Sequence, residues 1–505
     1  MIQTVENIGE KLVSMLTYDA SQPLIFSSGL FLFLFAGFLF FYGFTRRAPM
    51  ARIVYVILFS LYFYYKSSGI YFLLLVFASV SDYWIAHAIY KVRTQRAKYW
   101  LVGLSVLVNL GMLGYFKYTN FLIEIANNLF GQGFLNFQNI FLPVGISFFV
   151  FQSMSYTIDI SRGQLKPLGN WCDYLFYLSF FPQLVAGPIV RARDFIPQIR
   201  QNPIVVTREM FGTGVFLILT GLFKKAIISD YISLNFVDRI FDEPLLYSGF
   251  ECLAGIYGYA LQIYCDFSGY SDMAIGIALL LGFRFPKNFD APYKSATITE
   301  FWRRWHISLS SWLRDYLYIS LGGNRKGKLR TYGNLLVTML LGGLWHGAAI
   351  RFILWGALHG AALALHKLWM AVVPGAKATG DRMHWWSRAA GIFFTCLLYL
   401  TIGPLFAIPR CATVSFTTGV APMLGDSGAE WLYLLIFSAV FFAFVLFFSL
   451  RPGKITVWIG KIINPIFLIF FAVLMIAALL APGAAASAVE PVAAYQSDAF
   501  FPSLI

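Results

Sequence analysis

Residues 24–44 read LIFSSGLFLFLFAGFLFFYGF, an apolar run without a charged side chain. About 20 consecutive apolar residues are enough to cross the hydrocarbon core of a bilayer as a helix. The run is followed by Arg46 and Arg47, and basic residues at this position are typical of the cytoplasmic end of a membrane helix. The stretch therefore predicts a transmembrane helix.

The whole chain has the composition of a membrane protein. Of its 505 residues, 59% are hydrophobic, 18% are aromatic and only 12% are charged. Soluble domains contain about 45–50% apolar and about 25% charged residues, so a bilayer must solvate the excess. The formal net charge of +14 indicates basic cytoplasmic loops rather than contact with nucleic acid. The five cysteines are scattered and odd in number, which gives no disulfide or metal pattern.

Further apolar runs follow along the chain, and several are short or interrupted by Gly and Pro. They cover residues 53–65, 69–90, 99–116, 139–158, 171–187, 209–228, 250–282, 332–345, 349–371, 389–407, 431–450 and 462–481. We predict an all-α, multi-pass integral membrane protein with about eleven transmembrane helices plus re-entrant and interfacial helices. Basic clusters between the runs can all be cytoplasmic only under two conditions. Segment 171–187 must enter the membrane and return to the side from which it came, and 332–345 must pair with 349–371 to return the chain to the cytoplasm. Both termini then lie outside.

Residues 284–330 do not fit a simple bundle of crossing helices. They contain ten Lys or Arg and three acidic residues, interleaved with Trp and Tyr. This combination predicts helices lying in the cytoplasmic interface. The stretch is either an anchor for lipid headgroups or a docking face for an anionic cytosolic ligand, and charge alone favours the anchor.

Three histidines lie where chemistry is plausible. His346 is deep in apolar sequence between glycines, and a desolvated neutral imidazole there is a competent proton acceptor. An interhelical hydrogen bond is an equally good interpretation of His346 taken alone. His306 follows the aromatic and basic sequence FWRRW, where an ordinary interfacial histidine is the simpler interpretation. His359 lies in an apolar run beside Gly360, as a packing residue or a partner near the site.

A third polar group lies inside the apolar run 250–282. Its members are Asp266, Tyr270, Ser271 and Asp272. Acidic side chains inside a membrane segment need partners, which we expect among the arginines of 303–314 or the histidines. They could equally line an ion or proton path, which is the best argument for a transporter. No P-loop, dinucleotide-binding, serine-hydrolase or zincin motif is found in the sequence, and no metal site is predicted.

Several ordered blocks carry a resemblance. They are LPVGISF from Leu142, SYTIDI from Ser155, FPQLVAGPI from Phe181, DFSGYSD from Asp266, NFDAPY from Asn288, FWRRWH from Phe301 and LWHG from Leu344. In this order the chain resembles the membrane-bound O-acyltransferase family, in the bacterial branch that O-acetylates alginate. The D-alanyl transferases of teichoic acid are a more distant resemblance.

The resemblance implies a ring of helices around a thinned central site, where a cytosolic acyl donor and an extracytoplasmic acceptor approach from opposite faces. The family's essential histidine corresponds to His346, and its second polar position corresponds to His306. We expect His346 to accept the proton of the acceptor hydroxyl and His306 to orient the donor or to stabilise the oxyanion. Supporting or donor-binding roles are expected for Asp266, Tyr270, Ser271, Asp272, Arg303, Arg304, Arg314, Trp345 and His359.

The predicted organisation is N-terminal transmembrane helices in 1–140, the catalytic core in 141–371, C-terminal transmembrane helices in 372–481 and an Ala-rich tail in 482–505. The predicted activity is transfer of an acyl group, most simply acetyl, from a thioester such as acetyl-CoA or an acyl carrier, with no bound cofactor. The acceptor is an exopolysaccharide hydroxyl, reached directly or through an SGNH-type periplasmic partner that works with the export machinery. The predicted location is the bacterial inner membrane. Peptidoglycan or teichoic-acid acylation, transport of acyl groups or ions, and a scaffold role are the alternatives.

Overall fold

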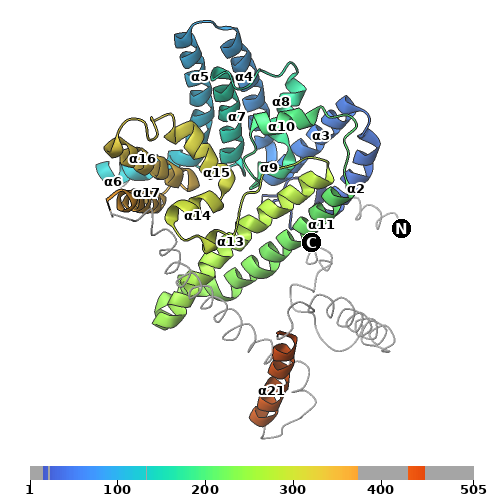
Figure 1. Ribbon diagram of the computed structural model, residues 1–505, viewed down its shortest axis with the longest axis vertical. Coiled ribbons are helices and arrows are strands. Elements are labelled where there is room, and N and C mark those ends of the chain that lie inside the picture. The colour runs from blue at the N-terminus through green and yellow to red at the C-terminus, as the bar shows by residue number, and fades with distance from the viewer. Residues whose placement is uncertain (1–14, 21–22, 132, 373–429, 450–505) are drawn as a thin grey trace. The chain divides into compact units, whose positions relative to one another are not determined.

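The computed structural model describes residues 15–20, 23–131, 133–372 and 430–449, and no β-strand occurs among them. Residues 1–391 and 392–505 form two compact units. The longer helices of the first unit are α2 (Gly29–Thr45), α3 (Pro49–Ser68), α4 (Phe72–Lys91), α5 (Gln95–Leu113), α6 (Thr119–Phe130), α7 (Ile146–Ser161), α11 (Arg208–Leu222), α13 (Gly249–Leu280), α16 (Lys328–His346) and α17 (Ile350–Val372) (Figure 1). In the second unit α21 (Glu430–Ser449) is described.

Shorter elements connect these helices. They are α8 (Trp171–Ser179), α9 (Phe181–Leu184), α10 (Ala192–Ile199), α12 (Asp238–Asp242), α14 (Ile298–Arg304), α15 (Ile307–Trp312), the 3₁₀ turns η1 (Gly69–Tyr71), η5 (Pro244–Leu246) and η6 (Pro292–Lys294), and the π-helical turns η2 (Gly114–Tyr118), η3 (Phe223–Asp230), η4 (Ser233–Val237) and η7 (Leu313–Tyr318). The predicted all-α class is therefore confirmed for the described residues.

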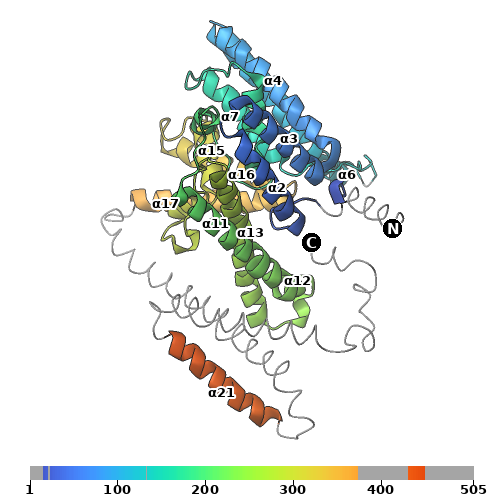
Figure 2. The same cartoon turned by 90° about the vertical axis from the view of Figure 1, so that its right-hand side faces the viewer.

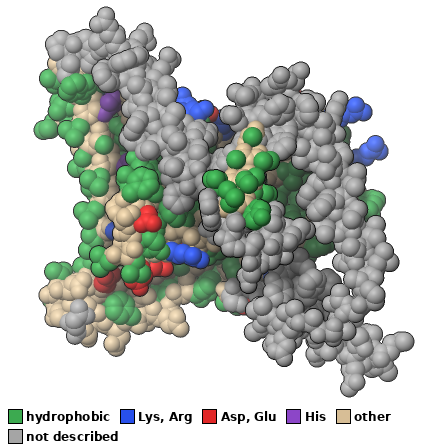
Figure 3. Space-filling model, turned by 90° about the horizontal axis from the view of Figure 1, so that it is seen from below, with side chains coloured by type: hydrophobic (Ala, Val, Ile, Leu, Met, Phe, Trp, Pro, Cys, Tyr) green, Lys and Arg blue, Asp and Glu red, His purple; other side chains and the backbone are tan. Residues whose placement is uncertain are grey.

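Three helical segments in the described part are long and apolar enough to cross a membrane. They are Pro49–Lys91, Gln95–Phe130 and Arg208–Asp242, and Gly29–Thr45 is a shorter apolar helix. The predicted count of about eleven crossings is thus not confirmed. On the face shown in Figure 3, hydrophobic side chains are spread over the described surface, with a few acidic and basic side chains between them. The predicted runs 389–407 and 462–481, with His384, Cys396 and Cys411, lie outside the described residues.

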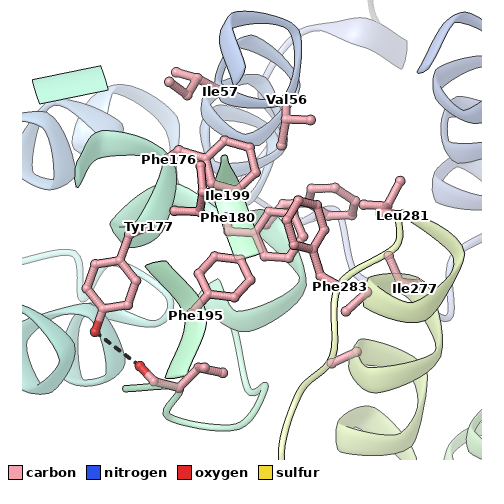
Figure 4. Packing of buried hydrophobic residues seen from close by; sticks show 14 of the residues in the cluster. Val56, Ile57, Phe176, Tyr177, Phe180, Phe195, Ile199, Ile277, Leu281 and Phe283 are labelled. Carbon is pink, nitrogen blue, oxygen red and sulfur yellow. Dashed lines mark hydrogen bonds between the residues drawn. The ribbon is translucent and has the colours of Figure 1, made fainter. Parts of the chain in front are cut away.

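Segment 171–187 is folded into two helices, α8 and α9, that meet at Phe180. A nine-residue helix is about 14 Å long, which is too short to cross a bilayer. Aromatic rings pack tightly here: Phe180 lies 5.1 Å from Phe195 and 5.1 Å from Phe283 by ring centroids (Figure 4). This cluster joins the short helices to α3 and to the end of α13.

Two pairs of helices lie side by side because glycines allow their backbones to approach. Along α11 and α13, Gly221 faces Gly269 and Gly214 faces Gly276 (Figures 1 and 2). In the α16–α17 hairpin, a Cβ atom on Gly343 would collide with the carbonyl of Phe352. The close hairpin holds the C-terminal end of α16 against α17. The predicted pairing of 332–345 with 349–371 corresponds to this hairpin of α16 and α17.

Before α16 begins at Lys328, the stretch 284–330 contains only the short elements η6, α14, α15 and η7. This agrees with the prediction that the basic stretch does not cross a membrane. The stretch begins directly after α13 and leads into α16. It therefore brings His306 between the two long elements that carry the other predicted site residues.

Candidate active site

His306 lies in the turn between α14 and α15 and is almost completely buried, with 1% of its surface exposed. Its backbone is left-handed, with φ 42° and ψ 57°, and it forms the N-cap of α15. A bulky residue rarely adopts this conformation unless its surroundings impose it. The sequence places His306 among aromatic and basic residues but does not show that the side chain is buried.

Asn288 determines the tautomer of His306. Asn288 Oδ1 accepts hydrogen bonds from the backbone N–H of Ser308 at 3.2 Å and from the Ser308 hydroxyl at 2.9 Å. Since a backbone N–H can only donate, the atom it meets must be the amide oxygen. His306 Nδ1 lies 3.1 Å from the same oxygen, so Nδ1 carries the proton and donates it. The other ring nitrogen, Nε2, is then an acceptor.

That acceptor nitrogen has no partner among the described residues, although it is buried. The His306 ring is enclosed by aromatic rings, with centroid distances of 4.8 Å to Phe267, 6.1 Å to Phe289, 6.4 Å to Phe148 and 6.2 Å to Trp345. Burial lowers the pKa of His306 well below its ordinary value, and the nearby His346 adds to the effect. The ring therefore has a buried lone pair that lacks a partner within the described part of the chain.

His346 is the last residue of α16, and its side chain is exposed. Its ring meets two indoles edge to face, with centroids 5.0 Å from Trp345 and 5.1 Å from Trp355. The ring is accessible, yet the protein around it displaces enough water to lower the pKa of His346, with Lys117 and His359 adding to the effect. The apolar, glycine-flanked sequence around His346 does not show that α16 ends at this residue and leaves its side chain exposed.

Trp345 lies between the two histidines. It is buried, and its ring is 6.2 Å from His306 and 5.0 Å from His346. His359 extends the same chain of rings on α17, 4.6 Å from Trp355. The structure thus brings together His306, Trp345 and His346, and it places His359 one ring further away.

Two acidic residues of α13, Asp266 and Asp272, pair with lysines of η3. Asp272 pairs with Lys224 at 2.6 Å, and Asp266 pairs with Lys225 at 2.7 Å. The expectation that these acids pair with the arginines of 303–314 or with histidines is therefore wrong, because α13 packs on η3, which carries both lysines. Tyr270 is buried and stacks on Phe26 at 4.6 Å.

Ser271 is the member of this group that reaches the histidine site. Asn288 Nδ2 donates to Ser271 Oγ at 3.0 Å, and Asn288 Oδ1 in turn accepts from His306. Ser271 therefore helps to hold the amide that fixes the His306 tautomer.

A cavity of about 580 Å³ lies between α14, α15, η7, α16 and α17. Its polar lining includes Arg303, Arg314 and Lys367, and Trp302 forms part of its wall. Arg314 also pairs with Asp315 at 2.7 Å. Arg304 does not line the cavity: it pairs with Glu300 at 2.8 Å. Two of the three predicted donor-binding arginines are thus together.

Two residues of the site were not predicted. Asn288 lies in a block that carries the resemblance, but nothing in the sequence shows that it meets His306 across 18 positions. Lys117 lies beside Trp345, and its Nζ donates to the Trp345 carbonyl. A lone cation near the end of an apolar run is a signal that could have indicated Lys117, because ionisable residues in membrane segments are commonly functional.

Two models of known protein families match parts of the chain. A family model described as the membrane-bound O-acyltransferase family matches residues 161–407, which include both histidines. A second model, described as a branched-chain amino acid transport protein, matches residues 333–505 and overlaps the first. Most of that second match lies outside the described residues.

Curated relatives point to one chemistry. The chain is 46% identical over 350 residues to a "probable alginate O-acetylase AlgI" of Azotobacter vinelandii, covering 68% of this chain and 69% of the relative. It is 38% identical to a peptidoglycan O-acetyltransferase of Helicobacter pylori, covering 68% and 70% of the two chains. It is 29% identical to a teichoic acid D-alanyltransferase of Streptococcus thermophilus, covering 60% and 75%. The chain belongs to the membrane-bound O-acyltransferase family, in the branch that resembles the alginate O-acetylases, and it is an O-acyltransferase.

Proposed function

We propose that this protein O-acetylates a secreted polysaccharide, using a cytosolic acyl thioester and an acceptor hydroxyl on the extracytoplasmic side of a bacterial inner membrane. The observation that carries the proposal is the pair of imidazoles on either side of Trp345. One of them has a buried acceptor nitrogen without a partner among the described residues, and the other is accessible. Two neutral imidazoles suit proton transfer from a hydroxyl.

His346 is the proton acceptor in this mechanism. A sugar or serine hydroxyl is a weak nucleophile at neutral pH, so a base must take its proton as the oxygen attacks the thioester carbonyl. The ring of His346 is accessible, and its neutral form is favoured. An acceptor can therefore reach it without displacing a side chain of the core.

His306 is not suited to stabilise an oxyanion, which was one of the two roles that the resemblance implied. Its Nδ1–H is held by Asn288, and its Nε2 carries no hydrogen. The neutral ring can therefore accept a hydrogen bond at Nε2 but cannot donate one to a developing oxyanion. In this proposal His306 orients the acceptor hydroxyl next to His346.

The donor is bound from the side of the 580 Å³ cavity. Arg303, Arg314 and Lys367 give its lining positive charge, which suits the phosphates of acetyl-CoA or of a phosphopantetheine arm on an acyl carrier. Arg303 has no ion-pair partner within the described part of the chain. No cofactor is needed, because the thioester is a substrate.

The wider arrangement belongs to the same proposal. About eleven crossings surround a central site, so that donor and acceptor approach from opposite faces. The acceptor is a polymer hydroxyl, or a serine of an SGNH-type periplasmic partner that passes the acetyl group to the polymer during export. Alginate is favoured as the polymer by the similarity to the probable alginate O-acetylase of Azotobacter vinelandii, with cellulose, peptidoglycan and teichoic acid as alternatives.

The test is acetyl transfer by the purified protein in lipid vesicles. Acetyl-CoA with a radiolabelled acetyl group is supplied on one side, and alginate, cellulose or peptidoglycan oligosaccharides are supplied in parallel on the other. Covalent label in one acceptor, lost in His346→Ala, is the expected result. Label that stays on CoA with every acceptor, and also with a purified periplasmic partner, overturns the proposal.

Transport is the second candidate, favoured by the match to a transport family over residues 333–505. The pairs Asp266–Lys225 and Asp272–Lys224 would be its ionisable groups. In the same vesicles, a transporter moves solute across the membrane unchanged. Accumulation of unmodified solute without labelled acceptor would favour transport over acyl transfer.

A further inference from the structure

Lys117 brings a positive charge to the histidine site from a distant helix. It lies in the π-helical turn η2, within the predicted membrane segment Gln95–Phe130. A lysine in such a segment is costly unless it has a use. Within the described part of the chain, its Nζ has no carboxylate within ion-pair distance.

The contacts of Lys117 are with the end of α16. Its Nζ donates to the Trp345 carbonyl and to Ser147 Oγ at 3.4 Å, and it lies 5.6 Å from the centre of the Trp345 ring. The neighbouring Tyr118 hydroxyl donates to the Leu344 carbonyl at 2.7 Å. The last carbonyls of a helix have no partner within the helix, so the π-helical turn binds two of them just before His346.

One N–H of the Lys117 ammonium has no described partner. An ammonium group has three donors, and the contacts with Trp345 and Ser147 use two of them. Its hydrogen bond to the Trp345 carbonyl places the positive charge beside the residue that directly precedes His346. The third donor is available to an anion at the site.

The reaction needs such a donor, because His306 cannot supply it. The Trp345 indole N–H also has no described partner and is a second, neutral donor at the site. Hydrogen bonds from a charged donor are roughly twice as strong as neutral ones. Lys117 therefore has the charge and the unused donor that a negatively charged oxygen requires.

We propose that Lys117 is the residue that stabilises the oxyanion of acyl transfer, an inference that rests on the proposed function. The acceptor oxygen bonds to the acyl carbon, and its proton passes to His346. The thioester carbonyl oxygen becomes negative and accepts a hydrogen bond from the Lys117 ammonium. The C–S bond then breaks, and the leaving thiolate takes the proton from His346. Lys117 neither gains nor loses a proton in this sequence.

The test compares Lys117→Met and Lys117→Arg with the matched control Tyr118→Phe, which removes the adjacent contact with α16 but no charge. Removing one oxyanion donor lowers kcat by about 10²–10³-fold in other enzymes, and we expect a loss of that order in Lys117→Met with little change in the donor KM. Lys117→Arg should keep more activity than Lys117→Met, and Tyr118→Phe should stay within a few-fold of the wild type.

The pH profile separates the charge from a structural contact. The titratable groups around the accessible imidazole are Lys117, His306 and His359. Loss of the Lys117 cation should move the acid limb of kcat to higher pH in Lys117→Met, whereas Lys117→Arg and Tyr118→Phe should leave it in place.

Several results overturn the proposal. They are a folded Lys117→Met variant with near wild-type kcat, an unmoved acid limb, an equal loss in Tyr118→Phe, and a failure of both Lys117 variants to fold, which would make Lys117 purely structural. If the wild-type protein transfers no acetyl group, that result contradicts the proposed function rather than the role of Lys117. The two failures are therefore distinguishable.

Discussion

The two histidines of the site are held in opposite ways. His306 is buried, its backbone is left-handed, and Asn288 fixes its tautomer through a hydrogen bond of 3.1 Å. His346 is exposed at the end of a helix, and within the described residues its ring has aromatic contacts but no hydrogen bond. The first ring is preorganised, whereas the second can adjust to an acceptor.

The largest effect should come from the accessible ring. His346→Ala should lower acetyl transfer by about 10²–10⁴-fold, the range that a general base contributes. The folded protein should survive, because exposed side chains away from special contacts usually change stability by less than about 0.5 kcal/mol. Initial rates in vesicles and thermal unfolding in detergent measure the two effects.

His359→Ala is the control for that experiment, because it removes an imidazole one ring further from the site. It should lower the rate far less than His346→Ala does. Equal losses in the two variants, or a His346→Ala protein that no longer folds, would contradict the assignment of His346 as the base.

The buried ring should respond to substitution through its backbone as well as its side chain. Asparagine adopts the left-handed conformation more readily than alanine and can accept a hydrogen bond. We expect His306→Asn to retain more activity and a higher free energy of unfolding than His306→Ala, with a loss of about 10²-fold or more in the alanine variant. Small and equal effects in both would show that the His306 ring only fills space.

Parts of this site could be predicted from the sequence, and parts could not. The apolar run 250–282 corresponds to the helix Gly249–Leu280, and the resemblance indicated both histidines. The burial of the two rings could not be predicted, because it depends on where α16 ends and how the turn at His306 is packed. Local sequence does not show that Asn288 Oδ1 accepts hydrogen bonds both from the His306 ring and from the backbone at the start of α15.

Long-range pairs were also beyond the sequence. Lys117 meets Trp345 across 228 positions, and Lys224 meets Asp272 across 48. Such contacts are set by which helices pack together, and periodicity within one helix carries no information about its partner. The sequence indicated that the acids of α13 need partners, but it did not identify the lysines of η3 as those partners.

The pH dependence should be set by the two rings together. Burial lowers the pKa of His306, so its neutral form persists as pH falls below the ordinary histidine value of about 6.5. Activity that depends on neutral imidazoles should therefore be full above that value, and its acid limb should lie below pH ~6.5. Rates measured from about pH 5 to 8 at saturating donor test this, and an acid limb at or above 6.5 would contradict it.

The smallest effect should come from the cavity, where adjacent arginines provide a matched pair. Arg303 lines the 580 Å³ cavity, whereas Arg304 lies outside it and pairs with Glu300 at 2.8 Å. If the cavity binds an anionic donor, Arg303→Gln should raise the donor KM a few-fold and leave kcat unchanged, while Arg304→Gln should have no effect on either.

Salt should imitate the Arg303 substitution in the wild type, because charges beyond a Debye length of about 8 Å are screened at ~0.15 M ionic strength. It should have less effect on the Arg303→Gln variant, which has already lost the charge. Initial rates against acetyl-CoA concentration at two salt concentrations measure both. If Arg303→Gln and Arg304→Gln raise the KM equally, general surface charge attracts the donor. If neither does, and the proteins insert normally, the basic stretch 284–330 anchors the chain, and the donor reaches the two histidines by another route.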